Sequence, residues 1–229
     1  MAMRCPIGAL AAVAPEVGRG NAAGSRGPLT SVPGAAVGLY LPSREFAHAG
    51  HELTQRILRS KLSREHDPAL AWLLAAAAMH FPGFTPELVV SLPPTPGQED
   101  RFHNIRSELA RRTAACDAGA ALSQTRAVPD YRRMTVAQRR AASDGRCTAS
   151  RLVRGRSVLL IDDVVASGGQ ASDAIRALHA AGAADVRFVC LARSVGAAGG
   201  RAGEAPHPDL FALRARPVRP GCRSRTITP

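Results

Sequence analysis

The stretch VLLIDDVVASGGQ, residues 158–170, decides the fold class. Four apolar residues lead into two adjacent aspartates, Asp162 and Asp163, and a glycine turn follows two valines later. An apolar run of this length predicts a strand buried on both faces of a parallel sheet. Parallel sheets bind ligands at the carboxyl ends of their strands, so the two carboxylates lie at a candidate binding edge.

The turn Ala166-Ser167-Gly168-Gly169-Gln170 predicts a phosphate site. Its glycines let the backbone approach a ligand, and a helix expected at 171–181 would aim its N-terminal N–H groups at the same point. Carboxylates repel phosphate, so Asp162 and Asp163 suit sugar hydroxyls or a hydrated cation beside it. A sugar phosphate meets both demands. The plainer alternative is a buried strand with two solvent-facing aspartates and an ordinary turn.

Two other acidic-strand motifs fit less well. A P-loop nucleotide-binding protein needs a G-x-x-x-x-G-K-[ST] loop, but the only lysine, Lys61, lies in SKLS with no glycines before it. A receiver domain would carry its acidic pair near the start of the domain, whereas here the pair follows more than 150 residues. Neither motif therefore explains residues 158–170.

Length, charge and cysteines limit the class of protein. The 229 residues suffice for one α/β domain with its own core and a small appendage. The net charge of +12 comes almost wholly from arginine, a bias that composition alone can produce, although arginine also suits phosphate. Five scattered cysteines without a C-x-x-C pair indicate reduced thiols in a cytoplasmic protein. The apolar run 69–81 is too short to span a bilayer, so no membrane association is expected.

The chain divides into a leader, one domain and a tail. Residues 1–36 are expected to be a disordered leader, and residues 196–229 a basic, mostly disordered tail with one edge strand at 207–215. The domain, 37–195, should comprise a helical hood at 37–84 and a core at 85–195. Its expected elements are helices at 43–62, 68–80, 100–115 and 171–181, strands at 87–94, 157–162 and 185–192, and a loop with at most one helix at 116–156.

The pattern of residues 158–170 resembles the phosphoribosyl pyrophosphate (PRPP) signature of type I phosphoribosyltransferases. YRRMTVAQRRAAS (131–143) ahead of this strand, and IRALHAAGAADVRFVCLAR (175–193) after it, are similar to the ComF-like, competence-associated branch, also labelled amidophosphoribosyltransferase-like. The resemblance covers residues 38–195. It implies an α/β fold in which a Rossmann-like parallel sheet is flanked by helices and carries a small N-terminal helical hood.

The resemblance also implies a reaction and roles for individual residues. The reaction is displacement at the anomeric carbon of PRPP with release of pyrophosphate, and Mg²⁺ is held mainly through the substrate's own oxygens. Asp162 and Asp163 would bind the ribose hydroxyls and, indirectly, the metal. The other implied positions are Ala166, Ser167, Gly168, Gly169 and Gln170 around the 5′-phosphate, Pro93 and Pro94 in the pyrophosphate loop, and Arg139 and Arg140, with Arg132 and Arg133, in a loop closing over pyrophosphate.

Three departures from the family pattern leave the activity open. Ala166 and Gln170 stand where threonines are usual, so two hydroxyls to the phosphate are missing. Purine-salvage members carry an aspartate at the position of Ala166 as general base, and alanine cannot replace it, so hypoxanthine-type salvage is disfavoured. ComF-like proteins commonly bear a four-cysteine zinc module, of which only Cys5 is present.

Three functional hypotheses follow. The first is a PRPP-dependent phosphoribosyltransferase with an unknown acceptor. The second is a non-catalytic PRPP-sensing or interaction module linked to DNA uptake or repair. The third, weaker hypothesis is direct nucleic-acid binding through the basic stretch, which charge favours but the 4% content of aromatic residues does not. A homodimer is left open.

Overall fold

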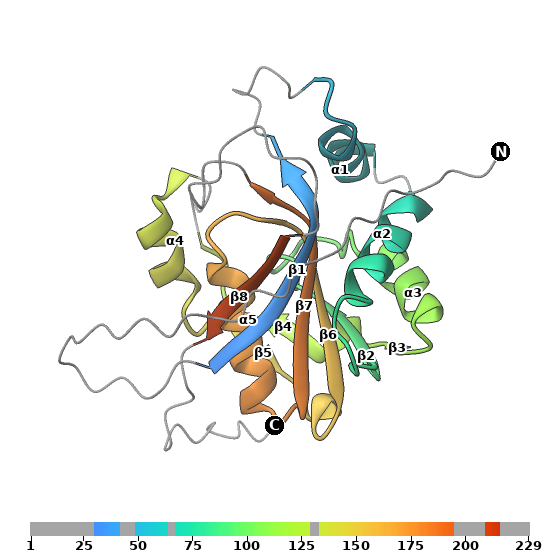
Figure 1. Cartoon of the computed structure of the whole chain (residues 1–229). Helices are drawn as coiled ribbons and strands as arrows, with labels where there is room; N and C mark the ends of the chain where they lie inside the picture. Colours follow the sequence, from blue (N-terminus) through green and yellow to red (C-terminus); the bar gives the residue numbers. More distant parts are fainter. Residues whose placement is uncertain (1–29, 42–48, 64–66, 129–132, 195–208, 216–229) are drawn as a thin grey trace, which may run out of the picture.

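The computed structural model describes residues 30–41, 49–63, 67–128, 133–194 and 209–215. In these ranges the chain forms a three-layered α/β structure, with a six-stranded sheet between two layers of helices (Figure 1). The predicted fold class is therefore confirmed. None of the helices in these ranges combines the length and apolar character needed to cross a bilayer.

The sheet has the strand order β3-β2-β6-β7-β1-β8. The first five of these strands run parallel to one another, and β8 is antiparallel to β1 at the edge. The edge strand predicted at 207–215 is thereby confirmed. The bounds are β1 Thr30–Tyr40, β2 Leu88–Ser91, β3 Cys116–Asp117, β6 Ser157–Val165, β7 Asp185–Ser194 and β8 Asp209–Ala215.

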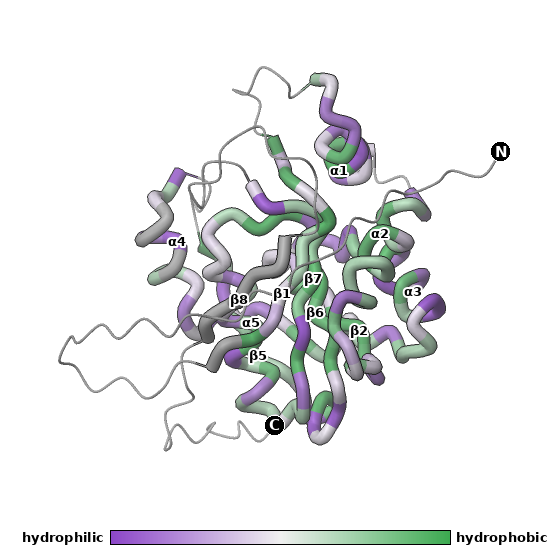
Figure 2. Tube along the Cα trace, in the orientation of Figure 1, coloured by the Kyte–Doolittle hydropathy of each residue, from purple (hydrophilic) through white to green (hydrophobic). Residues whose placement is uncertain are grey.

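The central strand β6 separates two apolar cores because successive side chains of a strand point to opposite faces. Val158 and Leu160 belong to the core under α5 (Gly169–Ala180). Leu159 and Ile161 belong to the core under α2 (Pro68–Ala78) and α3 (His103–Arg112). All four side chains are fully buried, and Figure 2 shows the apolar run through β6 and β7 at the middle of the sheet.

The two N-terminal helices pack against different parts of the sheet. The sequence of α2 is apolar all round, and the helix packs on β7 and β1 beside α3 as part of one helical layer. The Asp67 carboxylate caps its N-terminus, as it accepts a hydrogen bond from Ala69 N at 3.0 Å. Helix α1 (Glu52–Ser63) instead lies near the carboxyl ends of β1 and β7 (Figure 1). Both helices thus reach the candidate binding edge, α1 with Lys61 and α2 with Leu70, which line one pocket together with Asp163.

The prediction of a leader over residues 1–36 is wrong for residues 30–36, which form the first part of β1. The residues of this strand are mostly small, and Ala35 and Ala36 are fully buried. At Gly38 a Cβ atom would lie 2.9 Å from Leu53 Cδ2. Small residues thus let α1 and α2 pack closely on the strand, but they carry almost no apolar periodicity. Residues 1–29 lie outside the described ranges.

Residues 116–156 contain the single expected helix, α4 (Val136–Ser143), and also a second small sheet. Strands β4 (Leu122–Gln124) and β5 (Cys147–Ala149) pair antiparallel, and α5 packs against β5. The prediction of a loop was wrong here because strands of three residues are too short to show alternation. Two 3₁₀ turns, η2 (Gly119–Ala121) and η4 (Arg151–Val153), flank this sheet.

The remaining elements agree with the sequence to within a few residues, except for the first helix. A helix from Ser43 was expected, but α1 starts at Glu52, and residues 42–48 lie outside the described ranges. At its start His51 Nδ1 lies 2.8 Å from Thr54 Oγ1 and accepts a hydrogen bond from Thr54 N at 3.3 Å. A histidine therefore takes the capping position at this end.

Candidate functional site

The candidate site lies where the chain reverses the direction in which it builds the sheet. After β2 the chain passes through α3 on one face and moves outward to β3, whereas after β6 it passes through α5 on the other face to β7. The carboxyl ends of β2 and β6 are adjacent, with Leu92 N donating to Ile161 O at 3.0 Å. Parallel sheets open a ligand crevice at such a reversal.

One pocket at this edge, which we call the loop pocket, is open to solvent and larger than a second pocket beside α1. Its walls come from Asp162, from the continuous segment 164–171 and from Arg139 of α4. The structure thus brings Asp162 together with the whole turn 166–170 that the sequence singled out. An arginine from a segment more than twenty residues earlier completes the wall.

The turn in the loop pocket has a backbone suited to an anion. Gly168 adopts φ +70°, a left-handed conformation that glycine takes without strain, and it precedes the first residue of α5. It caps the helix without a side chain, while Ser172 N donates back to Gly168 O at 2.9 Å. The N–H groups of the first turn of α5 and the positive end of its dipole therefore face the pocket.

Asp162 brings a carboxylate beside this turn. Its Oδ1 accepts a hydrogen bond from Asp163 N at 2.8 Å, and its side chain is partly exposed. Burial of the carboxyl and the neighbouring charge of Asp163 raise the pKa of Asp162 to about 8. A ligand that donates hydroxyl groups, or that brings a cation, would stabilise its ionised form.

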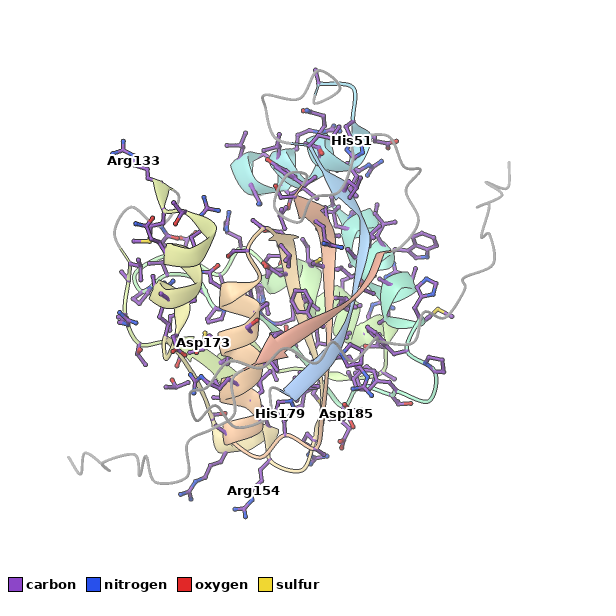
Figure 3. The ribbon with its side chains drawn as sticks, turned by 60° about the vertical axis from the view of Figure 1, so that its left-hand side comes forward. His51, Arg133, Arg154, Asp173, His179 and Asp185 are labelled. Carbon is purple, nitrogen blue, oxygen red and sulfur yellow. The ribbon has the colours of Figure 1, made fainter. Side chains whose placement is uncertain are left out.

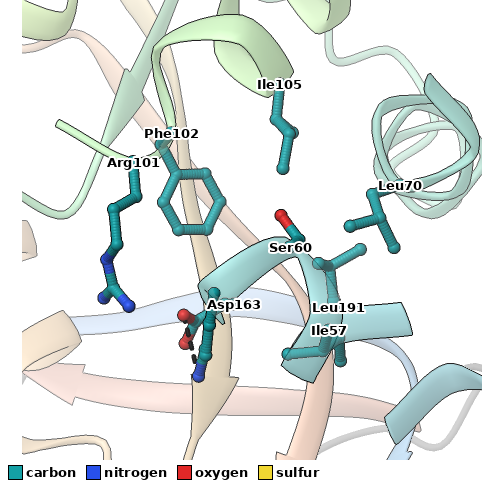
Figure 4. A pocket seen from close by; sticks show the side chains of 9 residues that line it. Ile57, Ser60, Leu70, Arg101, Phe102, Ile105, Asp163 and Leu191 are labelled. Atoms are coloured by element: carbon teal, nitrogen blue, oxygen red, sulfur yellow. Dashed lines mark ion pairs between the residues drawn. The ribbon is translucent and has the colours of Figure 1, made fainter. Parts of the chain in front are cut away.

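Asp163 faces the opposite side of the sheet. Its Oδ2 forms an ion pair with Lys61 Nζ of α1 at 2.9 Å, and Lys61 also lies 5.8 Å from the centre of the Tyr40 ring. Asp163 lines a second, small pocket, which we call the α1 pocket (Figure 4). The sequence analysis expected both aspartates to bind ribose hydroxyls, but the structure places Asp162 at the loop pocket and Asp163 at the α1 pocket.

The loop after β2 is held by the small sheet. Pro93 O accepts a hydrogen bond from Gln124 Nε2 at 2.8 Å, and Gln124 Oε1 accepts one from the buried Arg146 Nη2 at 2.5 Å. Pro93 and Pro94, expected in a pyrophosphate loop, thus lie at the crevice but line neither of the two pockets.

Of the arginines expected to close over the site, the structure places one, Arg139, at the loop pocket. Helix α4 begins with a capping box between Thr135 and Gln138, which fixes the start of the helix. Arg139 lines the loop pocket and donates from Nε to Met134 O at 2.9 Å. Arg133 projects from the outer end of this segment (Figure 3). Arg132 and the side chain of Arg140 lie outside what the structure describes.

Asp173 of α5 is a site-supporting residue that the sequence analysis missed. Its buried carboxylate accepts hydrogen bonds from Gly145 N at 2.8 Å, Cys147 N at 2.6 Å and Arg176 Nε at 2.9 Å. These bonds join α5 to the chain just after α4 (Figure 3), and so they fix Arg139 relative to the turn. The available signal was an aspartate on the buried face of α5, where an acidic side chain needs partners.

A buried arginine fixes the other loop at the crevice. Arg106 is 4% exposed and donates to Ser91 Oγ at 2.8 Å, to Asp100 Oδ2 at 2.5 Å and to Asp117 Oδ1. Gly119 passes so close that a Cβ atom there would lie 2.2 Å from the guanidinium. The segment between β2 and α3 is therefore tied at both ends to one side chain.

Magnesium was expected to be held mainly by the substrate. The described residues contain no group of three or more His, Cys, Asp or Glu side chains placed to bind a metal. The donor available in the loop pocket is the Asp162 carboxylate, an oxygen ligand of the kind that Mg²⁺ prefers. The residues present therefore fit a cation that takes its remaining ligands from a substrate and from water.

Comparison with known proteins matches part of this chain to one family. Residues 107–209, a little under half of the chain, match the family model of the phosphoribosyl transferase domain. The matched segment contains the turn 166–170, both aspartates and Asp173. The matched segment is thus similar to a phosphoribosyl transferase domain, and the mostly parallel sheet flanked by helices matches the fold class of the type I phosphoribosyltransferases.

Two solved structures are among those similar to this chain. One is titled as the allosteric regulatory enzyme of purine biosynthesis, with 20% identity, a TM-score of 0.36 and coverage of 54% of this chain and 24% of that one. The other is the glutamine PRPP amidotransferase from B. subtilis complexed with ADP and GMP, with 20% identity, a TM-score of 0.37 and coverage of 54% and 25%. The chain spans about a quarter of the length of either protein. A comparison with curated proteins finds no match.

Proposed function

We propose that this protein binds PRPP with Mg²⁺ and is a phosphoribosyltransferase of the ComF-like type, acting in the cytoplasm. The observation that carries the proposal is the convergence of Asp162, the turn 166–170 and the N-terminus of α5 on one pocket. A carboxylate beside an anion-binding turn suits a molecule that has sugar hydroxyls and a phosphate. The match of residues 107–209 to the phosphoribosyl transferase domain supports the same ligand.

The chain's own residues act mainly by orientation. The turn and the first N–H groups of α5 hold the 5′-phosphate, and Asp162 accepts hydrogen bonds from ribose hydroxyls. With the ribose fixed at both ends, its anomeric carbon is presented to an acceptor. The acceptor atom supplies the electron pair of the new bond, and the C–O bond to pyrophosphate breaks with its pair leaving on pyrophosphate. Arg139 adds positive charge at the same pocket.

Magnesium, when bound with the substrate, would neutralise charge on the leaving pyrophosphate. Asp162 is the residue that would hold it, together with oxygens of PRPP. Because an ionised carboxylate is the better ligand, PRPP and Mg²⁺ should bind more tightly as the pH rises toward the raised pKa of Asp162, about 8.

A non-catalytic PRPP-sensing module, linked to DNA uptake or repair, is the second candidate. The observation that favours it is the ion pair of Asp163 with Lys61, which occupies one of the two signature carboxylates. The turn also has Ala166 and Gln170 where hydroxyl side chains would strengthen phosphate binding. Under this alternative PRPP binds but no acceptor releases pyrophosphate from it.

The test is a titration of the full chain with PRPP in the presence and absence of Mg²⁺, followed by thermal unfolding. At a ligand concentration of 100 times Kd, binding should stabilise the fold by about 2.7 kcal/mol, and chelation of the metal should remove most of this. The Asp162→Asn variant should not be stabilised by PRPP. The matched control is Asp185→Asn, at the opposite end of the sheet, and PRPP should stabilise this variant as it does the parent. No stabilisation of the parent protein up to millimolar PRPP would contradict the proposal.

Catalysis is tested separately from binding. Pyrophosphate release from PRPP is measured with ammonia, amines, nucleobases and aromatic acids as acceptors. Release that depends on one acceptor class supports the enzyme. Binding of PRPP without release in any class supports the sensing module instead.

A further inference from the structure

The small sheet β4–β5 is bonded to both walls of the crevice at the carboxyl ends of β2 and β6. One wall is the loop after β2, where Gln124 Nε2 of β4 donates to Pro93 O at 2.8 Å. The other wall is the turn 166–170 with α5 behind it, and there the Asp173 carboxylate accepts a hydrogen bond from Cys147 N of β5 at 2.6 Å. Gln124 and Cys147 are opposite each other in the β4–β5 ladder. One rung of this small sheet therefore joins the two walls.

The Gln124 amide is fixed in one orientation by a buried arginine. Arg146 is 3% exposed, and its Nη2 donates to Gln124 Oε1 at 2.5 Å. Because a guanidinium can only donate, the amide oxygen must face Arg146, and the amide nitrogen is left to face Pro93. Pro93 is itself buried, and a buried carbonyl needs a donor. Gln124 therefore supplies a bond that the loop after β2 requires in this position.

The sequence of the loop after β2 makes its exact position important. Proline has no backbone N–H, and prolines stand at positions 93, 94 and 96. Thr95 therefore carries the only backbone N–H and the only hydroxyl between residues 93 and 96. A loop with several N–H groups could meet an anion in more than one position, whereas this loop offers its donors at one residue. A small displacement of the loop would thus remove its contact with an anion.

From this geometry, and resting on the proposed function, we propose that Gln124 is a positioning residue that fixes the loop after β2 relative to the turn 166–170. Under that function the 5′-phosphate binds the turn, and the ribose directs its diphosphate toward the other wall of the crevice. Gln124 does not touch the ligand. It holds Pro93, and so places Thr95 where a phosphoryl group on the anomeric carbon can reach it. The site then selects a sugar phosphate that carries this second group over one that lacks it.

The test compares PRPP with ribose 5-phosphate, each titrated into the full chain with Mg²⁺ present and followed by calorimetry. The two ligands share the ribose and the 5′-phosphate and differ in the diphosphate. Gln124→Met keeps the length of the side chain but cannot donate to Pro93 O. It should weaken PRPP binding by about tenfold, the effect of one lost hydrogen bond at the displaced loop, and leave the binding of ribose 5-phosphate unchanged.

A second variant keeps the test decisive if Gln124→Met does not fold. Gln124→Glu retains an oxygen that accepts from Arg146, but it also cannot donate to Pro93 O, so it should weaken PRPP binding as Gln124→Met does. The matched control is Ser123→Asp, which adds the same negative charge at the neighbouring, exposed position of β4. The Ser123 hydroxyl lies 3.0 Å from Thr148 Oγ1 of β5. The control variant should bind both ligands as the parent does.

The outcomes separate this inference from the proposed function. If the variants weaken both ligands equally, or weaken neither, Gln124 does not position the loop for the second phosphoryl group and the inference fails. It fails also if Gln124→Met binds PRPP as the parent does and only Gln124→Glu is weakened, because the added charge then explains the loss. If the parent binds both ligands alike, the sugar phosphate site remains but selection by the loop is refuted. If the parent binds neither ligand, the proposed function itself fails.

Discussion

Replacing Asp162 with asparagine should stabilise the ligand-free protein at neutral pH while it abolishes PRPP binding. The pKa of this carboxyl rises from the ordinary 3.8 to about 8, because the group is buried and lies next to Asp163. Each pKa unit corresponds to about 1.4 kcal/mol, which sets an upper limit near 4 kcal/mol at pH 7. Because the side chain is partly exposed, water screens the repulsion that raises the pKa. We therefore expect the free energy of unfolding of Asp162→Asn to exceed that of the parent by about 2 kcal/mol.

The gain should depend on pH in a defined direction. The pKa is higher in the folded protein than in the unfolded chain, so the folded protein holds the extra proton between about pH 4 and pH 8. In that window stability of the parent falls as the pH rises. Asparagine does not titrate, and its Oδ1 can still accept the hydrogen bond from Asp163 N. The advantage of the variant should therefore be small at pH 4 and largest near pH 8.

The assay is urea unfolding of parent and variant at several pH values, supported by thermal melts. For a chain of 229 residues, 2 kcal/mol corresponds to a rise in Tm of about 4–8 °C. Asp163→Asn is the internal comparison, since it removes the ion pair with Lys61 and should give no comparable gain. The reasoning is refuted if Asp162→Asn is less stable than the parent at pH 7, or if its gain is the same at pH 4.

Three further predictions concern the surroundings of the site. Gly168→Ala places a side chain on a residue with φ +70°, so it should lower stability by about 1 kcal/mol in urea unfolding and weaken PRPP binding; an unchanged midpoint would argue against the turn geometry. Asp173→Asn keeps only one of two carboxylate acceptors for backbone N–H groups, so unfolding should show a loss of about 2–3 kcal/mol, and a neutral result would contradict its supporting role. Cys116 is exposed, whereas burial raises the pKa of Cys147 to about 12 and that of Cys190 well above its usual value. Among the cysteines in the described ranges, mass mapping after a thiol reagent should therefore find Cys116 modified and Cys147 and Cys190 protected until the protein unfolds.

The sequence predicted the parts of the fold whose apolar pattern is strong. Residues 157–194 have a buried strand, a glycine turn, a helix and a second buried strand, and each occurs as expected. Strand β1 was missed because alanine and glycine bury little area and give no periodic signal, although Ala35 and Ala36 are at the centre of the packing. The β4–β5 pair was missed because each of its strands has three residues, too few to show alternation, and only the folded chain shows that α5 packs against it.

The site was predictable only where its members are neighbours in the chain. Asp162 and the turn 166–170 are within nine residues and share one strand and one helix start, so their convergence follows from local structure. Asp173 and Arg106 act through partners between 3 and 28 positions away, and only the folded chain shows which N–H group or carboxylate each will meet. Buried charges of this kind signal that a partner exists but not which one.

The two aspartates show how one misplaced strand end changes a functional prediction. With the strand ending at Asp162, both carboxylates could turn toward a single sugar. In the folded chain Asp162 lines the loop pocket, whereas Asp163 lines the α1 pocket and pairs with Lys61 of α1. Under the proposed function Asp162 meets the sugar phosphate, whereas Asp163 holds α1 beside the site through its ion pair with Lys61. In that arrangement the adjacent pair does not duplicate one role, and exchanging the two positions by a one-residue register shift would separate both carboxylates from their partners.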